Sequence, residues 1–283
     1  MHIISSAAEM TAFSKAAQRA GKRVGFVPTM GALHEGHLSL VRAARAHSDV
    51  VVVSIFVNPT QFGPNEDFAK YPRSFDNDKA MLEGEGADCI FSPSVEEMYP
   101  PGATTWVTVE GLSEKLDGRS RPGHFRGVTT VVSKLFNIVQ PELAFFGQKD
   151  AAQAAIIRKM VRDLNFDVQI MVCPIVRESD GLAMSSRNAY LNPEQRGQAT
   201  VLHRSLECVQ ALMKQGENNA EKLISYGKQT IAKESSVQLD YFEIVHPDTL
   251  APVSDVAHGA LVAVAAYLGT TRLIDNLLVP PQR

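Results

Sequence analysis

The feature that most constrains the fold is a repeated alternation between two kinds of segment. Apolar runs rich in β-branched residues alternate with stretches in which apolar residues recur every three or four positions. The runs have the composition of strands buried on both faces of a sheet, and the stretches have the period of helices. This order is typical of βαβ units. We therefore expect an α/β fold built on a parallel sheet that is covered on both faces.

The elements expected in the first part of the chain end at Val176. Strands are predicted at residues 23–28, 49–57, 87–92, 143–146 and 168–176. Helices are predicted at residues 7–20, 36–47, 75–85, 127–139 and 151–164. The polar segment 62–74 contains two prolines and predicts a mobile loop over a site.

The pattern changes after Val176, where a polar loop at 177–188 is followed by two predicted helices and three predicted strands. The helices are expected at 194–214 and 220–233, and the strands at 239–245, 260–267 and 271–278. A Gly-Thr pair between the last two strands favours an antiparallel hairpin. We therefore expect two domains, residues 1–176 and a smaller α+β domain at residues 177–283.

Composition and charge argue against several classes of function. Lys and Arg number 28 against 31 Asp and Glu, so the net charge of −3 gives no broad positive surface for nucleic acid or anionic membrane. The longest apolar runs are shorter than the roughly 18 residues of a membrane helix. The N-terminal segment lacks a basic region before an apolar core, so we do not expect a secretory signal. Three widely spaced cysteines favour neither a disulfide framework nor a zinc cluster. We expect a soluble protein of a reducing compartment, here the cytoplasm.

The strongest local motif is PTMGALHEGH at residues 28–37, which follows the first predicted strand and opens a helix. Ligands bind at this edge of an open parallel sheet, and a helix N-terminus attracts phosphate. His34 and His37 lie three residues apart, so both imidazoles could donate hydrogen bonds to phosphate oxygens. Gly31 and Gly36 would allow close approach of backbone to a ligand.

Other interpretations of this histidine pair remain open at this point. The two side chains could simply be surface or capping histidines, or they could bind zinc with a third ligand. Neither a Gly-x-Gly-x-x-Gly fingerprint nor a Walker A loop is present in the sequence. If the chain binds a nucleotide, it does so by another motif.

Three further segments place polar side chains where predicted strands end. In the segment 145–153, Lys149 could contact phosphates, Asp150 could cap a helix or bind a metal, and Gln153 would face the same opening. The loop at 177–188 carries Ser and Arg side chains that could wrap a phosphate, but it could equally be a linker. Gln61, like Gln153, suits a neutral polar ligand, although it could serve only to stabilise a turn.

Together, the motifs at residues 28–37, 58–62, 121–128, 147–153 and 184–188 resemble those of the pantothenate synthetases, also called pantoate–β-alanine ligases. The resemblance extends over nearly the whole chain and the motifs occur in the family order. It implies a Rossmann-like domain of the nucleotidyltransferase superfamily, a smaller C-terminal domain that covers the site, and a homodimer. It also implies that ATP and (R)-pantoate form pantoyl adenylate and diphosphate, and that β-alanine then displaces AMP.

The resemblance also implies roles for individual residues. His37, His34, Lys149 and Arg187 would be catalytic, with His37 the best candidate proton donor. Gln61 and Gln153 would bind pantoate, and Gln61 would also receive β-alanine. ATP would be bound by Met30, Gly31, Ala32, Leu33, His34, Glu35, Gly36, His37, Gly147, Gln148, Lys149, Asp150, Val176, Met184, Ser185, Ser186 and Arg187.

The resemblance further implies a Mg²⁺ ion that is held mainly by the phosphates of ATP, and the lack of a carboxylate cluster in the sequence fits this. Asp150 and Asp78 are the candidate protein ligands of this ion. Asn77 interrupts a run that is often fully acidic in relatives. The segment 63–74 corresponds to a flexible gate that would protect the adenylate from water.

Three other functions are compatible with parts of the sequence. A generic nucleotidyltransferase would use the same histidine pair, but its acceptor pocket should carry more basic groups than Gln61 and Gln153. A nucleotide-binding protein without catalysis would not need His34, His37 and Lys149 together. A fragment of a tRNA-binding synthetase should carry a basic surface for nucleic acid.

Overall fold

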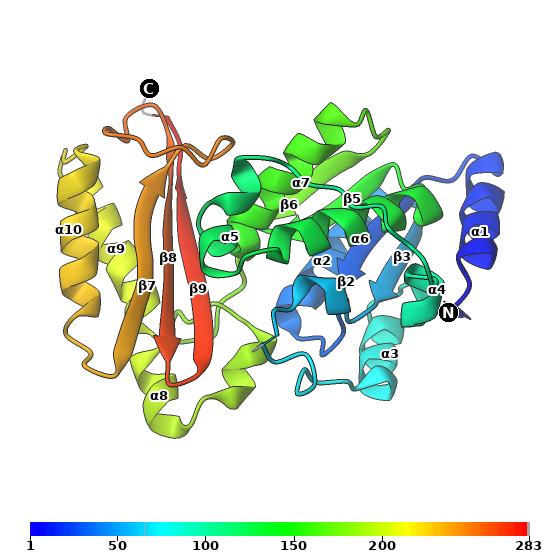
Figure 1. Ribbon diagram of the computed structural model, residues 1–283, viewed down its shortest axis with the longest axis horizontal. Helices are drawn as coiled ribbons and strands as arrows, with labels where there is room; N and C mark the ends of the chain where they lie inside the picture. The colour runs from blue at the N-terminus through cyan, green and yellow to red at the C-terminus, as the bar shows by residue number, and fades with distance from the viewer. Residues whose placement is uncertain (65, 282–283) are drawn as a thin grey trace.

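The computed structural model describes residues 1–64 and 66–281, and two β-sheets organise this part of the chain (Figure 1). The larger sheet has six parallel strands in the order β1-β4-β3-β2-β5-β6. The smaller sheet is antiparallel, with the order β7-β8-β9. The expected α/β class is therefore confirmed. Among the described residues, no helix has both the length and the apolar character required to cross a membrane.

The strands of the large sheet are short and strongly apolar. They are β1 (His2–Ile4), β2 (Val24–Thr29), β3 (Val50–Ile55), β4 (Cys89–Phe91), β5 (Leu143–Gly147) and β6 (Gln169–Cys173). In β3, Val52 packs into the core on one face and Val53 into the core on the other, because successive side chains of a strand point in opposite directions. This two-sided burial explains why the central strands read as uninterrupted apolar runs.

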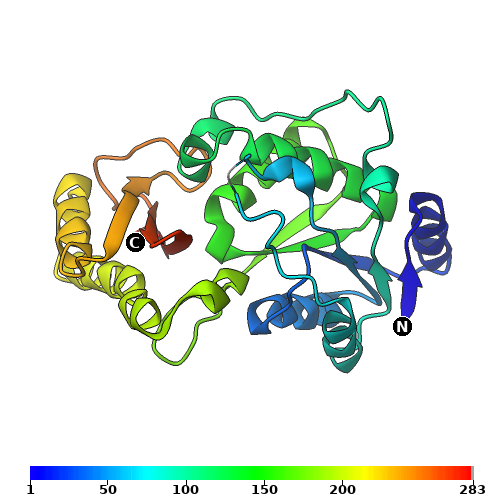
Figure 2. The same cartoon turned by 60° about the horizontal axis from the view of Figure 1, so that its bottom comes forward.

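Helices cover both faces of the large sheet, as Figures 1 and 2 show. On one face, α1 (Ala7–Arg19), α6 (His124–Val139) and α7 (Ala151–Asp163) contribute to the core; on the other face, α2 (Glu35–His47) and α3 (Phe75–Gly84) do so. Short helical turns fill the connections: η1 (Pro59–Gln61), α4 (Val95–Met98), η2 (Leu112–Glu114), α5 (Asp117–Ser120) and η3 (Gln148–Asp150).

The order of the strands places a topological switch between β2 and β5. From β2 the chain builds outward through β3 and β4, and it then returns to add β5 and β6 on the other side. Loops that leave β2 and β5 therefore diverge at their carboxyl ends and leave a crevice, which is where open α/β sheets bind ligands. The motifs at 28–37 and 147–153 both begin at this point.

The small sheet packs between its own helices and the core of the large sheet. It contains β7 (Val237–Val245), β8 (Ala260–Leu268) and β9 (Thr271–Val279), and it is accompanied by η4 (Ser186–Tyr190), α8 (Pro193–Gln198), α9 (Val201–Lys214) and α10 (Ala220–Ile231). Val262 and Val264 of β8 belong to the core formed with α9 and α10, whereas Leu261 and Ala263 belong to the core of the large sheet. Because successive side chains of β8 point to opposite faces, this strand packs into both cores and joins them.

Most expected elements are present, and the differences have local causes. The antiparallel hairpin between β8 and β9 is confirmed. The single helix expected at 194–214 is wrong, because the chain forms α8 and α9 with a break at Ala199 and Thr200. Strand β1 was not predicted, since only Ile4 of its three residues is buried and so short an edge strand has no period to detect.

Candidate active site

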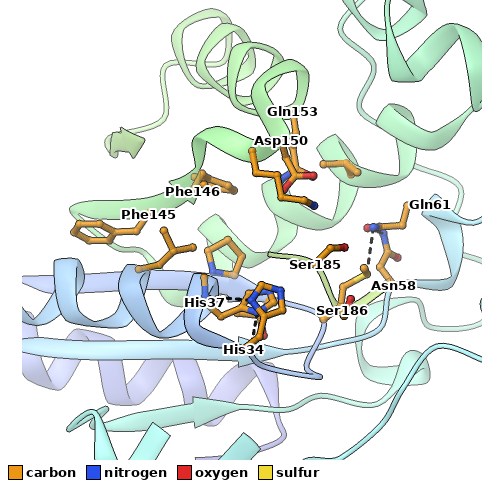
Figure 3. Close-up of a pocket in the computed structure, with 18 of the residues that line it drawn as sticks. His34, His37, Asn58, Gln61, Phe145, Phe146, Asp150, Gln153, Ser185 and Ser186 are labelled. Carbon is orange, nitrogen blue, oxygen red and sulfur yellow. Dashed lines mark hydrogen bonds between the residues drawn. The ribbon is translucent and has the colours of Figure 1, made fainter. Parts of the chain in front are cut away.

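A cavity opens at the carboxyl ends of β2 and β5, at the topological switch (Figure 3). In Figure 3 the histidine pair lies on one side of it, Asp150 and Gln153 lie on the opposite side, and Gln61 lies at one end. Of the residues predicted from sequence, the following line this cavity: Met30, His34, Gly36, His37, Gln61, Gly147, Lys149, Asp150, Gln153, Val176, Met184, Ser185, Ser186 and Arg187. Segments far apart in the sequence therefore meet at one site.

The histidine pair forms a capping box at the start of α2. Nδ1 of His34 accepts a hydrogen bond from the Gly36 backbone N–H at 3.1 Å, and Nδ1 of His37 accepts one from the His34 backbone N–H at 3.3 Å. A Cβ at Gly36 would lie 2.9 Å from the His34 ring, so only glycine allows His34 to fold back onto the helix. The capping interpretation and the ligand interpretation are therefore both compatible with this structure.

The capping bonds also determine the charge and tautomer of both rings. A backbone N–H can only donate, so each Nδ1 must present its lone pair and each ring proton must be on Nε2. Burial, with the positive charge of Lys149, lowers the pKa of His34 to about 4. Burial, with the charges of His34 and Lys149, lowers the pKa of His37 to about 3. At neutral pH both residues are uncharged hydrogen-bond donors through Nε2–H.

Asp78 of α3 fixes the loop that connects β2 to this helix. Its side chain is buried, and its two oxygens accept hydrogen bonds from the backbone N–H groups of Ala32 and Leu33, each at 2.9 Å. Ala32 has a φ of 50°, a conformation that is unfavourable for a residue with a Cβ. The carboxylate therefore stabilises a strained loop, a role different from the metal contact predicted for Asp78.

Gly31 shows why a glycine is needed beside this carboxylate. Its φ is +79°, and a Cβ at this position would lie 2.9 Å from a carboxylate oxygen of Asp78. In the structure the Asp78 carboxylate lies beside Gly31 and the His34 ring lies beside Gly36, which lines the cavity; close approach of a ligand to these glycines stays a prediction.

On the opposite side of the cavity, η3 and the start of α7 present Lys149, Asp150 and Gln153. Asp150 makes no side-chain capping bond to α7, so its carboxylate is not used as a helix cap. Asn276 of β9 donates to the carbonyl oxygens of Gln148 and Lys149, both at 2.9 Å, and accepts from the Gln148 side chain. The small sheet thereby holds the turn that carries Lys149.

The loop between β6 and α8 supplies Ser185, Ser186 and Arg187. The hydroxyl of Ser185 accepts a hydrogen bond from the Arg187 backbone N–H at 3.2 Å. The Arg187 guanidinium donates to both carboxylate oxygens of Asp67, at 3.2 and 3.0 Å. The Tyr71 hydroxyl lies 3.4 Å from the hydroxyl of Ser186. Two residues of the predicted gate therefore contact the predicted phosphate loop, although Asn65 of that gate lies outside the described residues.

Gln61 is held by neighbours that leave it facing the cavity. Its Oε1 accepts from Asn58 at 3.1 Å, and its Nε2 donates to the sulfur of Met30 at 3.2 Å. Asn58 is itself buried, and its Oδ1 accepts a hydrogen bond from the Tyr99 hydroxyl at 2.9 Å. A network of neutral groups thus holds the Gln61 side chain in place.

Several residues predicted for ATP binding or metal binding do not line the cavity: Gly31, Ala32, Leu33, Glu35, Gln148 and Asp78. Leu33 is buried in the core beneath α2, and Glu35 pairs with Arg42 at the surface. The side chain of Gln148 faces Asn276. Within a continuous motif, the structure separates residues that face the cavity from residues that only shape the loop.

Among the lining residues with ionisable side chains, three had no individual role predicted from sequence, namely Tyr71, Arg121 and His124. Arg121 and His124 precede and open α6, in the segment RPGHFRGV, which contributed to the family resemblance alone. The sequence signal that could have identified them is an arginine and a histidine three residues apart at the start of a helix.

The arrangement is suited to a polyanion beside a neutral polar ligand. Neutral Nε2–H donors, the Lys149 ammonium and the Arg187 guanidinium surround one part of the cavity. The amides of Gln61 and Gln153 occupy another part. Charge-assisted donors stabilise phosphate oxygens strongly, and amides can orient hydroxyl and carboxylate groups.

Comparison with known proteins gives a consistent result. The family model described as pantoate-beta-alanine ligase matches residues 2–278. A pantothenate synthetase of Koribacter versatilis is 63% identical over 279 residues, which are 99% of this chain and 96% of that protein. A pantothenate synthetase of Thermotoga petrophila is 58% identical over 279 residues, which are 99% of this chain and 100% of that protein.

Solved structures agree with the fold described above. The crystal structure of pantothenate synthetase from Thermus thermophilus matches with a TM-score of 0.94 at 49% identity, covering 99% of this chain and 100% of that one. Pantoate-beta-alanine ligase from Francisella tularensis, solved with beta-gamma ATP and β-alanine, matches with a TM-score of 0.81 at 34% identity. That alignment covers 98% of this chain and 97% of the Francisella chain.

Proposed function

The chain belongs to the pantoate–β-alanine ligase family, and we propose that the cavity between β2 and β5 performs both steps of that ligation. The enzyme condenses pantoate with β-alanine at the expense of ATP. The assignment of residues rests on one observation. His34, His37, Lys149 and Arg187 line a single cavity that also contains neutral amide side chains.

In the first step, a carboxylate oxygen of pantoate attacks the α-phosphorus of ATP. A bond forms between this oxygen and the α-phosphorus. The bond from the α-phosphorus to the oxygen that bridges it to the β-phosphorus breaks, and diphosphate leaves. A carboxylate is a poor acyl donor, and the adenylate gives it a good leaving group. Catalysis of this step requires donors that are already in place around the phosphate oxygens as negative charge shifts to diphosphate.

We assign the donors by their positions in the cavity. His34 and His37 would each donate Nε2–H to phosphate oxygens, which matches their neutral state better than the transfer of a proton by His37. Lys149 would contact the α- and β-phosphates. Ser185, Ser186 and Arg187 would hold the departing diphosphate, after Arg187 exchanges Asp67 for phosphate.

Mg²⁺ fits this site as an ion held mainly by ATP. Within the described residues there is no group of three or more His, Cys, Asp or Glu side chains that could hold a metal. Mg²⁺ commonly keeps several waters and uses one or two carboxylates together with substrate phosphates. We assign the protein contact to Asp150, which lines the cavity, and not to Asp78, whose oxygens accept backbone bonds. When bound, the ion would neutralise charge on the phosphates.

In the second step, the amine of β-alanine attacks the carbonyl carbon of the adenylate. A C–N bond forms, the bond from that carbon to the AMP oxygen breaks, and the amine proton passes to solvent. Gln61 and Gln153 would orient the pantoyl group during this step. Water would compete as a nucleophile. We propose that the gate segment, residues 63–74, protects the adenylate through its contact with Ser186 and, once diphosphate has left and Arg187 pairs with Asp67 again, through its contact with Arg187.

The organisation of the chain follows from the same proposal. Residues 1–176 would bind and activate substrates, and residues 177–283 would cover the site. A homodimer in the cytoplasm is part of this proposal because it rests on the family resemblance. Light scattering of the purified protein tests the dimer.

Exchange of labelled diphosphate into ATP tests the proposed first step. We expect exchange that requires pantoate and does not require β-alanine. A generic nucleotidyltransferase would show no pantoate-dependent exchange, and a nucleotide-binding protein without catalysis would show none with any substrate. Either result would reject the proposed function.

A further inference from the structure

We propose that Arg121 binds the carboxylate of β-alanine, in a subsite that the Glu66 carboxylate occupies when the amine substrate is absent. This inference rests on the proposed function and adds a residue to it. The subsite lies where α6 begins, beside Gln61.

The proposal starts from the positive charges in the cavity. Among the described residues, three side chains with a permanent positive charge line it, namely Lys149, Arg187 and Arg121. The proposed function uses Lys149 and Arg187 for phosphates. β-Alanine enters with a carboxylate that must be stripped of water, and a buried anion without a partner is costly. Arg121 is the remaining permanent cation of the cavity.

The Arg121 guanidinium already holds a carboxylate with two parallel hydrogen bonds. Its Nε donates to one oxygen of Glu66 at 2.7 Å, and its Nη2 donates to the other at 2.6 Å. The side chains are 15% and 25% exposed, respectively. Such two-point pairing is the geometry by which arginine recognises carboxylates. Burial raises the pKa of Glu66, but its bonds to Arg121 outweigh burial and lower it overall.

His124 holds the guanidinium in this orientation. A guanidinium can only donate, so the 3.1 Å contact between Nη1 of Arg121 and Nε2 of His124 requires a lone pair on Nε2. The His124 proton is then on Nδ1, which donates to the Gln61 carbonyl oxygen at 2.9 Å. Burial and the charge of Arg121 lower the pKa of His124 to about 4, which keeps the ring neutral. The edge of Arg121 that faces Glu66 is therefore fixed independently of Glu66.

Glu66 belongs to the gate segment and is not part of this fixed frame. Its neighbour Asp67 pairs in the same way with Arg187, the residue assigned to diphosphate. Two consecutive carboxylates of the gate thus hold two arginines of the cavity. We infer that β-alanine replaces Glu66 on Arg121, so that its carboxylate is anchored there and its amine is left for the adenylate.

The test uses the full chain and compares two amines, β-alanine and 3-aminopropanamide, in which a neutral amide replaces the carboxylate. The variant is Arg121→Gln. The matched control is Arg119→Gln, which removes a half-exposed arginine that pairs with Glu243. Pantoate-dependent diphosphate exchange is measured in parallel, because it does not involve β-alanine.

We expect Arg121→Gln to raise the KM for β-alanine by about 10- to 100-fold, the loss typical of a charge-assisted contact. Its preference for β-alanine over 3-aminopropanamide should fall by a similar factor, whereas diphosphate exchange should stay within about twofold of the parent. Arg119→Gln should retain the parental preference. A variant that loses exchange as strongly as it loses ligation, or that retains the preference for β-alanine, overturns the proposal.

Glu66→Gln provides a second test, in which the KM for β-alanine should change in the opposite direction. Removing the competing carboxylate should lower the KM for β-alanine by about twofold to fivefold, as expected for a partly exposed ion pair. If Glu66 served only to support Arg121, this variant would raise the KM, as Arg121→Gln does, and the proposal would fail. Loss of exchange by the parental enzyme would instead reject the proposed function itself.

Discussion

The backbone N–H of His34 donates to Nδ1 of His37 at 3.3 Å, and this bond commits His37 to its neutral Nε2–H form. The residue that caps the N-terminus of α2 thus sets the tautomer of a side chain in the cavity. Fold and chemistry are linked here by one backbone hydrogen bond. A histidine held in this way can donate a hydrogen bond to phosphate throughout the neutral pH range.

The pH dependence of diphosphate exchange tests this state. Because the pKa of His34 is about 4 and that of His37 about 3, protonation of these rings should not reduce the rate between about pH 6 and 8. An acid limb with an apparent pKa near 6.5 that disappears in His37→Gln would contradict the neutral assignment. His246→Gln, which changes an exposed ring, is the control.

The same two pKa values predict how stability varies with pH. The unfolded state takes up these protons near pH 6.5, whereas the folded state does so only near pH 4 and 3. The unfolded state therefore binds more protons in between, so the histidines reduce the free energy of unfolding as pH falls from about 6.5 toward 4. Urea unfolding over this range measures the effect, and His37→Gln should weaken it. An unchanged slope in that variant would contradict the prediction.

Asp78→Asn tests whether Asp78 positions the loop or binds metal. Asparagine offers one carbonyl oxygen to two backbone donors, so we expect the free energy of unfolding to fall by about 2 kcal/mol and the KM for ATP to rise. The Mg²⁺ concentration for half-maximal exchange should not change. Asp76→Asn, in an exposed position on the same helix, is the control. A higher Mg²⁺ requirement with unchanged stability would instead favour metal binding.

Asn276→Ala tests the connection between the small sheet and the turn of Lys149. The change leaves two partly buried carbonyl oxygens without their donor, so we expect the free energy of unfolding to fall by about 2 kcal/mol. Diphosphate exchange should also slow, because Lys149 loses its support. Asn77→Ala, at an exposed position, should do neither. Full exchange activity in Asn276→Ala would show that the turn holds its shape alone.

The gate can be tested through the fate of the adenylate. When a short glycine linker replaces residues 63–74, water should reach the intermediate, and the enzyme should release AMP faster from ATP and pantoate in the absence of β-alanine. Lys70→Gln, an exposed change within the gate segment, should behave as the parent. A gate-deleted enzyme that hydrolyses no more adenylate than the parent would contradict the protective role.

The regular parts of the fold could be predicted from sequence because burial on two faces leaves a clear pattern. Val52 and Val53 belong to opposite cores, and so β3 reads as an apolar run. The break between α8 and α9 was missed because apolar positions continue through Ala199. The spacing of apolar residues does not reveal a break of two residues between helices.

In the site, as in the fold, residues could be predicted where they lie in one motif and could not be predicted where they depend on contacts between distant segments. The pair of His34 and His37 could be found because both lie in one motif at the end of one strand. Asp78 could not be placed, because its partners Ala32 and Leu33 lie 45 or more residues away and bond through backbone atoms. Arg121 could not be assigned from sequence for a related reason: its paired contact with the Glu66 carboxylate spans 55 residues.

Formation of AMP with each substrate omitted in turn tests the central claim most directly. We predict rapid AMP release only when ATP, pantoate and β-alanine are all present, with diphosphate formed from ATP and pantoate before β-alanine is added. Equal AMP release without pantoate, or none with all three substrates, would contradict the conclusion that this cavity activates pantoate and transfers it to β-alanine.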